Sequence, residues 1–146
     1  MSLINFYNED IQYRLRNKRL INKWLLSTIE SESGQVEEIS FIFTSDNFLI
    51  NLNTEYLSHD TFTDIITFQY NEEGDKLHSD VFISIERVKD NAKEFNQGIL
   101  KELHRVLIHG VLHLLGYEDK NKASKQLMTT KEDYYLSLRP EKLLSY

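Results

Sequence analysis

The sequence predicts an α+β fold: a single domain over residues 1–146 in which a roughly four-stranded mixed sheet has helices packed on it. Segments in which apolar residues alternate with polar ones are interspersed along the chain with segments of helical periodicity, and no repeat, linker or low-complexity tract separates them. The segment from about 99 to 115 is apolar almost all round beyond Val106, which predicts a helix in the centre of the domain. A chain of 146 residues is long enough to bury one such core.

The first strand and the first helix are predicted within the N-terminal thirty residues. Residues 3–8 read as a short strand. From about Ile11 to Ile29 apolar residues recur at helical spacing, which predicts an amphipathic helix. A turn follows at residues 31–34. The apolar face of this helix consists of Leu15, Leu20, Ile21, Trp24, Leu25 and Ile29.

A second strand and a second helix follow the turn. Residues 38–44 alternate with the period of two that is typical of a strand. Either Ser45 or Asp46 can cap the next helix, which ends near Tyr56 before a polar loop over residues 57–63. The alternating residues are Ile39, Phe41 and Phe43 on one face and Ser40, Ile42 and Thr44 on the other.

The middle of the chain predicts a β-hairpin or a near relative of one. Residues 64–70, DIITFQY, are β-branched and aromatic and read as a strand. Residues 71–75, NEEGD, read as a turn, and a second strand over 80–85 is expected to pair with the first. A helix over 86–95 then ends at Asn96 to Gly98.

Two helices are predicted in the last third, over about 99–115 and 122–138, with Pro140 ending the second. Gly110 lies inside the first, where glycine costs roughly 1 kcal/mol relative to alanine. Close packing against a strand or a bound metal is the expected reason for a glycine there. His104 lies about 140° around this helix from His109, which predicts a structural or exposed side chain.

Composition limits the classes of site and location. The chain has no cysteine, so any metal must be held by nitrogen and oxygen. No basic segment followed by an apolar run stands at the N-terminus, and no stretch approaches the ~20 apolar residues of a membrane span, so a cytoplasmic protein without membrane association is expected. The net charge of −6 argues against coating nucleic acid by bulk electrostatics but allows a local basic groove.

Residues 109–119, HGVLHLLGYED, predict a metal site. His109 and His113 are four residues apart, which on a helix brings both imidazoles to one face about 6 Å apart. Gly116 stands where a helix C-terminus often needs a left-handed residue, and the chain can then fold back to present Asp119 as a third ligand. The alternative is that two histidines on a helix are ordinary surface or core residues.

The same segment lacks an obvious general base. Gly110 occupies the position where metalloproteases with this histidine spacing keep a glutamate base. The remaining candidates for a catalytic carboxylate are Glu118, Asp64 and Glu102, in that order. Structural alternatives are a loop-to-strand cap for Asp64 and a first-turn carboxylate that suits the helix dipole for Glu102.

Several segments resemble the YbeY family of bacterial rRNA-maturation endoribonucleases. Residues 109–119 resemble that family's signature HGxLHLxGYDH. Residues 63–68, TDIITF, and 79–84, SDVFIS, are similar to two further family segments, and Glu102 falls where the family has an acidic residue. Leu52, Asn53 and Tyr56 are similar to the family's LN-x-x-Y segment.

The resemblance implies one bound metal ion, taken to be zinc, with His109 and His113 as ligands and Asp119 in the place of the family's third histidine. It implies an RNA hydrolase, namely a single-strand-specific endoribonuclease that acts in small-subunit rRNA 3′-end maturation and ribosome quality control. RNA and the small ribosomal subunit are the implied partners. The family has an arginine, a natural phosphate ligand, where this sequence has Leu57.

Two alternatives remain beside the endoribonuclease. Leu57 in place of the arginine is compatible with a ribosome-associated assembly factor whose metal is structural and whose nuclease activity is weak or absent. The other alternative is a metal-dependent hydrolase of a different substrate, such as a peptide, against which Gly110 argues.

Overall fold

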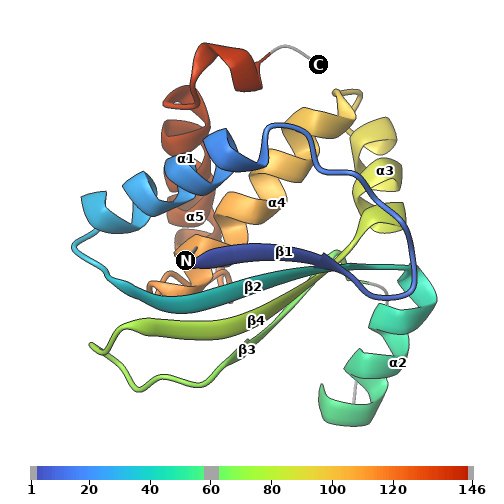
Figure 1. The fold of residues 1–146 in the computed structure, drawn as a ribbon, viewed down its shortest axis with the longest axis horizontal. Coiled ribbons are helices and arrows are strands. Elements are labelled where there is room, and N and C mark those ends of the chain that lie inside the picture. The colour runs from blue at the N-terminus through green and yellow to red at the C-terminus, as the bar shows by residue number, and fades with distance from the viewer. Residues whose placement is uncertain (1–2, 58–62, 145–146) are drawn as a thin grey trace.

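The four strands form one sheet, and most of the helices lie on one of its faces in the computed structural model (Figure 1). The structure describes residues 3–57 and 63–144. The strand order is β1-β2-β4-β3; β1, β2 and β4 run parallel and β3 is antiparallel to β4. The mixed sheet and the antiparallel pair are therefore confirmed. The strands are β1 Ile4–Asn8, β2 Val36–Thr44, β3 Ile65–Gln69 and β4 Leu77–Ser84.

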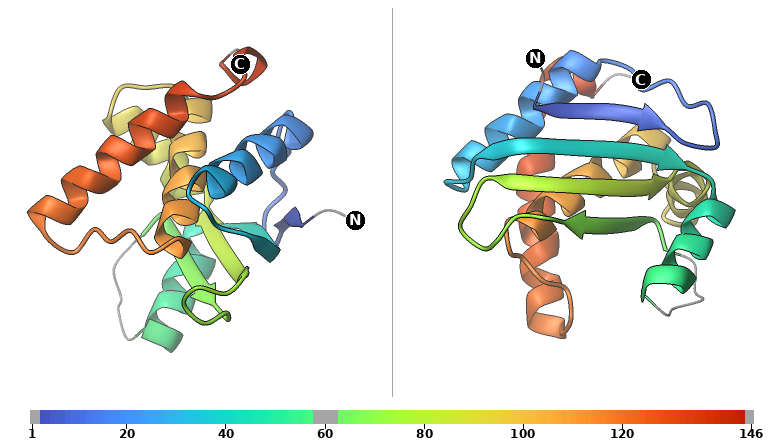
Figure 2. Two further views of the ribbon diagram at one scale, coloured as in Figure 1. Left: turned by 90° about the vertical axis from the view of Figure 1, so that its left-hand side faces the viewer. Right: turned by 60° about the horizontal axis from the view of Figure 1, so that its bottom comes forward.

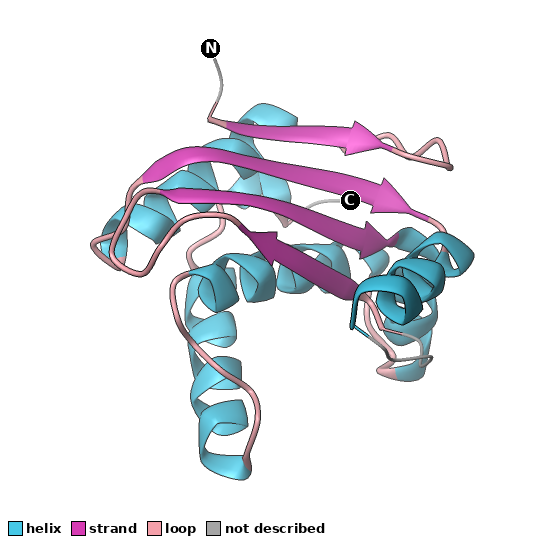
Figure 3. Ribbon diagram, turned by 90° about the horizontal axis from the view of Figure 1, so that it is seen from below, coloured by secondary structure: helices cyan, strands magenta, loops and turns pink. Residues whose placement is uncertain are grey.

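Four of the helices cover one face of the sheet, and α2 lies at one end of the other face (Figures 2 and 3). The ring of Phe48 on α2 stacks on that of Phe82, and Tyr56 meets Phe68 edge-on. The α+β class and the five predicted helices are confirmed in the described part of the chain. The helices are α1 Lys18–Ser31, α2 Asp46–Leu57, α3 Ile85–Glu94, α4 Ile99–Leu114, α5 Lys122–Ser137 and a short 3₁₀ turn, η1, at Glu141–Leu143.

The main core lies between the sheet and the helices, as the alternation in β2 predicts. Ile39, Phe41 and Phe43 are fully buried on the helix side, where they pack with residues of α1 and α4. Strand residues alternate between the two faces of a sheet, so one apolar face per strand is enough to build this layer.

Helix α4 is the predicted central helix, and Figure 1 shows it between α5 and α3, behind α1. Leu107, Ile108 and Val111 are fully buried, which confirms its position. A Cβ atom added at Gly110 would lie 2.8 Å from Cδ1 of Ile65 on β3 and 3.4 Å from Cγ1 of Val81 on β4. The glycine therefore lets α4 approach the sheet closely, which sets the site beside β3.

Three predicted starts were wrong, and the smallest difference is that β2 begins at Val36 rather than at residue 38. Helix α1 begins at Lys18 rather than near Ile11, because Asn17 takes a left-handed conformation and residues 9–17 connect the end of β1 with the helix layer (Figure 1). Leu15 is still buried, although it lies in this connection. Strand β4 begins at Leu77 rather than at residue 80, because its first residues pair with β2. In the residues that the structure describes, no helix is long and apolar enough to span a membrane.

Candidate active site

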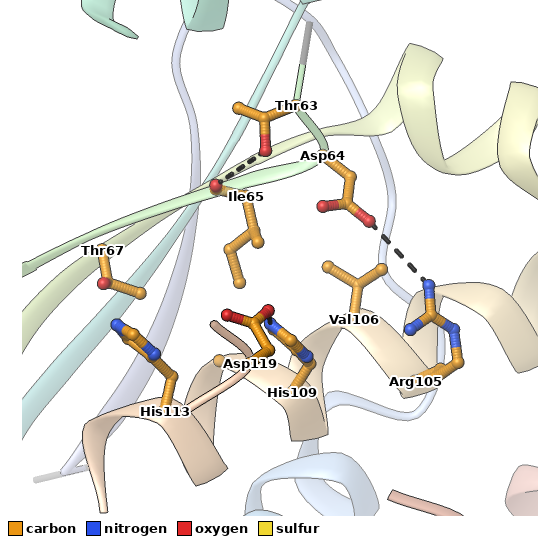
Figure 4. Close-up of a pocket in the computed structure, with 10 residues that line it drawn as sticks. Thr63, Asp64, Ile65, Thr67, Arg105, Val106, His109, His113 and Asp119 are labelled. Carbon is orange, nitrogen blue, oxygen red and sulfur yellow. Dashed lines mark hydrogen bonds and ion pairs between the residues drawn. The ribbon is translucent and has the colours of Figure 1, made fainter. Parts of the chain in front are cut away.

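The two histidines of the motif lie on the side of α4 that faces β3, at a pocket of about 290 Å³ (Figure 4). Their spacing of four residues produces this arrangement, because 3.6 residues make one helical turn. Asp119 lies beside His109 in the same pocket. The pocket is lined by Thr63, Asp64, Ile65, Thr67, Arg105, Val106, His109, Gly110, His113 and Asp119.

The turn after α4 brings Asp119 back to the helix. Gly116 has a φ of 110°, and the backbone N–H groups of Gly116 and Tyr117 donate to the carbonyl groups of His113 and Leu112. These two bonds form the Schellman motif that ends many helices at a left-handed residue, as predicted for Gly116. The Tyr117 hydroxyl then donates to Glu32 Oε1 at 2.6 Å, which fixes the chain two residues before Asp119 to the end of α1.

His109 has a carboxylate at each ring nitrogen. Its Nε2 is 3.6 Å from Asp119 Oδ2, and its Nδ1 is 2.6 Å from Glu132 Oε2 on α5. Burial alone lowers the pKa of His109, but the hydrogen bond and charge of Glu132, with the charges of Asp64 and Asp119, raise that pKa above its ordinary value.

Arg105 lines the pocket and contacts three carboxylates, those of Glu102, Glu132 and Asp64. Its Nε donates to Glu102 Oε1 at 2.9 Å, its Nη2 also binds Glu102, and its Nη1 is 3.3 Å from Glu132 Oε1. Asp64 Oδ2 lies 3.9 Å from its Nη2 (Figure 4). Hydrogen bonds to Glu102 raise the pKa of Arg105, so the guanidinium stays charged.

The three candidate catalytic carboxylates occupy different environments. Asp64 lines the pocket, and burial raises its pKa despite the opposing charges of Arg105 and His109. Glu102 is fully buried, its oxygens accept hydrogen bonds from Gln97 and Arg105, and it does not line the pocket. The Glu118 side chain is 58% exposed beside Lys120 and also lies outside the pocket lining. The catalytic roles stay predictions, and the geometry favours Asp64.

His104 has a structural environment, as predicted. It is buried, its Nδ1 lies 2.9 Å from Nη1 of Arg139, and its ring meets Trp24 edge-on. Burial, with the charge of Arg139, lowers the pKa of His104 to about 4. Because Arg139 can only donate, the Nδ1 of His104 accepts this bond and the ring is neutral.

Comparison with known proteins gives the family. The family described as Endoribonuclease YbeY matches residues 3–138 of this chain. The chain belongs to the YbeY family. The Endoribonuclease YbeY of Cytophaga hutchinsonii is 48% identical over 136 residues, which cover 93% of this chain and 95% of that protein. The Endoribonuclease YbeY of Flavobacterium psychrophilum is 46% identical over 132 residues, with 90% and 94% covered.

A solved structure confirms the fold of this YbeY family chain. The present structure is similar to the solution structure of a Thermotoga maritima protein, with a TM-score of 0.64 and 30% sequence identity. The similarity covers 92% of this chain and 87% of that protein. Leu57, which stands where the resemblance implies an arginine, is the last residue of α2, and its side chain and residues 58–62 lie outside the described residues.

The donor chemistry of the pocket fits the metal implied by the YbeY resemblance. The nitrogen of His109 that faces Asp119 is not taken by Glu132. The 3.6 Å between His109 Nε2 and Asp119 Oδ2 is close to the roughly 3.3 Å that separates two ligands of one tetrahedral zinc ion. His113 lines the same pocket, but no group of three His, Asp or Glu side chains within residues 3–57 and 63–144 is arranged to hold an ion.

Two residues of the site, Arg105 and Glu132, were not predicted from the sequence. A signal for Glu132 was present: Met128, Glu132 and Leu136 recur every four residues and lie on the buried face of α5. A glutamate at such a position must have a partner, because an unpaired charge is costly to bury. The partner cannot be read from the sequence, because it lies 23 residues away on another helix.

Proposed function

We propose that this protein is a metal-dependent endoribonuclease that cleaves single-stranded RNA, with His109, His113 and Asp119 as ligands of one divalent ion, zinc. The observation that carries the proposal is that these three side chains line one pocket. The family supports an RNA-cleaving role, because the curated relatives at 46 to 48% identity are named endoribonucleases.

The charge of the pocket supports a metal as part of the site. Asp64 and Asp119 bring negative charge into the pocket, and the charge of Arg105 is matched by Glu102 and Glu132 behind it. A phosphodiester carries a negative charge and is repelled by such a pocket unless a cation is added. A zinc ion held there would supply this charge, Lewis acidity and a lowered pKa of bound water.

The residues of the chain then have separate tasks. His109 would hold the ion through Nε2, the nitrogen that is not bonded to Glu132. Asp119, from the turn after α4, and His113, one helical turn further along α4, would be the other two ligands. Asp64 is suited to move a proton at the scissile phosphate, because it lines the pocket and burial raises its pKa above the ordinary value of a carboxyl group. Arg105 holds Glu102 and Glu132 in place and keeps its positive charge beside Asp64.

Packing argues against the peptidase alternative. A protease base would have to stand at Gly110, where even a Cβ atom would lie 2.8 Å from Ile65 Cδ1. The position faces the sheet, so a glutamate side chain has no room there. RNA is therefore the better substrate class. From the family resemblance alone, we propose the 3′ end of small-subunit rRNA as the natural target and ribosome quality control as the setting.

The test uses a single-stranded RNA that carries the 3′ precursor end of small-subunit rRNA, with its duplex as comparison. We expect the zinc-loaded protein to cleave the single strand, and chelation or His113→Ala to abolish cleavage because the ion is lost. His78→Ala is the matched control, since His78 is a half-exposed histidine of β4 beside Glu37 and outside the pocket. Cleavage that survives both chelation and His113→Ala contradicts the proposal.

The same assay separates the assembly-factor alternative, which Leu57 favours. If Leu57 attenuates catalysis, Leu57→Arg will increase cleavage strongly, because a guanidinium can bind the phosphate. A zinc-binding wild type with negligible cleavage, together with a strong gain in Leu57→Arg, indicates an assembly factor with a structural metal. Equal cleavage by the two proteins removes the argument based on Leu57.

A further inference from the structure

Glu132 reaches the candidate metal ligand His109 from a different helix. Helix α5 lies beside α4 (Figure 2), and Glu132 Oε2 is 2.6 Å from His109 Nδ1. The side chain of Glu132 is only 6% exposed, so water has little access to this hydrogen bond. The contact therefore constrains the imidazole strongly.

The second oxygen of Glu132 is also held. Oε1 lies 3.3 Å from Arg105 Nη1, and Arg105 is bound through two other nitrogens to the fully buried Glu102. The carboxylate of Glu132 is thus held at both oxygens, by Arg105 at Oε1 and by His109 at Oε2. A charge-assisted network of this kind leaves the carboxylate few alternative orientations.

This arrangement determines which nitrogen of His109 is available. A carboxylate can only accept a hydrogen bond, so the Nδ1 of His109 carries a hydrogen atom and donates it to Glu132. In the neutral ring the lone pair is then on Nε2, the atom 3.6 Å from Asp119 Oδ2. The nitrogen that can bind a cation is the one that faces the other candidate ligand.

We infer that Glu132 is a positioning residue of the metal centre, which fixes the Nε2-binding tautomer and the ring orientation of His109 and strengthens its bond to the ion. The inference rests on the proposed function, because it takes His109 as a metal ligand. Carboxylates that hold the second nitrogen of a ligating histidine usually act in this way. In the described part of the chain, the ring of His113 makes no such hydrogen bond, so Glu132 acts on one of the two histidines.

The test is zinc affinity, measured at pH 7.5 by competition with a chromogenic chelator and without any activity assay. We expect Glu132→Ala to weaken zinc binding by about 10- to 100-fold, the usual effect of losing such a partner. Glu132→Gln has nearly the same shape and should weaken binding by about tenfold, because its amide oxygen still accepts the hydrogen bond but lacks the charge. Circular dichroism confirms that each variant is folded.

Two further variants separate positioning from a purely structural role. Leu136→Ala removes a buried side chain from the same helix but leaves the hydrogen bond between Glu132 and His109 in place, and its zinc affinity should equal that of the wild type. In a His109→Ala background, Glu132→Gln should have no additional effect on zinc affinity, because its effect is transmitted through His109. A structural role of Glu132 would weaken binding equally in both backgrounds.

The outcomes distinguish this inference from the proposed function. If the wild type binds zinc and the folded variants Glu132→Ala and Glu132→Gln bind it equally well, the inference is overturned and the proposed function stays intact. If Glu132→Gln lowers zinc affinity equally in the wild-type and the His109→Ala backgrounds, the inference alone is also overturned. A wild type that binds no zinc overturns the proposed function and the inference together.

Discussion

At the scale of single residues, Gly110 shows how packing shapes the candidate site. Its missing side chain lets α4 approach Ile65 and Val81, and Ile65 lines the pocket together with both histidines. An alanine there would gain about 1 kcal/mol of helix propensity. That gain is opposed by the 2.8 Å approach to Ile65 Cδ1, which would have to turn away.

We predict that Gly110→Ala is neutral or destabilising by up to about 2 kcal/mol, since an overpacked core typically costs about 1 to 3 kcal/mol and the helix propensity of alanine offsets about 1 kcal/mol of it. Ile65→Val removes the Cδ1 atom that the new methyl group would meet. In that background Gly110→Ala should stabilise the protein by up to about 1 kcal/mol. Urea unfolding of the wild type, the two single variants and the double variant measures this double-mutant cycle. If Gly110→Ala changes the free energy of unfolding equally in both backgrounds, Ile65 is not the obstacle.

At the scale of elements, α5 matters because it carries Glu132 and begins just after Asp119. Its first turn is held by a capping box: Asn121 Oδ1 accepts from the Ser124 N–H at 2.9 Å, and Ser124 Oγ accepts from the Asn121 N–H at 3.0 Å. The two bonds satisfy N–H groups that a helix start leaves without partners.

Asn121→Ala should lower the free energy of unfolding by about 1 kcal/mol, because the side-chain acceptor of the cap is lost. The loss is measured by urea unfolding at neutral pH. Asn121→Asp is the control, since its carboxylate keeps the acceptor and interacts favourably with the helix dipole. If Asp and Ala variants are equally destabilised, the hydrogen bond of the cap is not the cause.

At the scale of the whole molecule, His104 links α4 to Trp24 of α1 and to Arg139 beyond α5. Its pKa is lowered to about 4 by burial and by Arg139, against about 6.5 in an unfolded chain. Above pH 6.5 the His104 ring is neutral in the folded and the unfolded protein, so its titration costs no stability. Between pH 6.5 and 4 the ring takes up a proton in the unfolded chain but not in the folded protein. The free energy of unfolding therefore decreases as the pH is lowered through this range.

We predict that the wild type loses more unfolding free energy between pH 7 and pH 5 than His104→Gln, by roughly 2 kcal/mol. Glutamine keeps an acceptor for Arg139 but does not titrate in this range. Other titrating groups, His109 among them, are common to both proteins and cancel in the comparison. Parallel pH profiles of the two proteins would show that His104 does not control acid stability.

The sequence alone determined the types of the elements, the buried position of α4, the common face of His109 and His113 and the left-handed turn at Gly116. These features depend on local periodicity and backbone geometry, which the residues themselves carry. Leu15, by contrast, fits the helical pattern but lies in the connection before α1. The pattern could not show where the helix begins, because tertiary packing also buries residues of a loop.

Only the tertiary structure decided which carboxylates meet the histidines. Asp64 directly precedes β3, Asp119 follows the turn after α4, and Glu132 lies on α5. Glu102, on α4 itself, is bound to Arg105 and does not line the pocket. The buried spacing around Glu132 indicates that it needs a partner, but the partner depends on how α4 and α5 pack. Such contacts join residues that are distant in the chain, and local patterns contain no information about them.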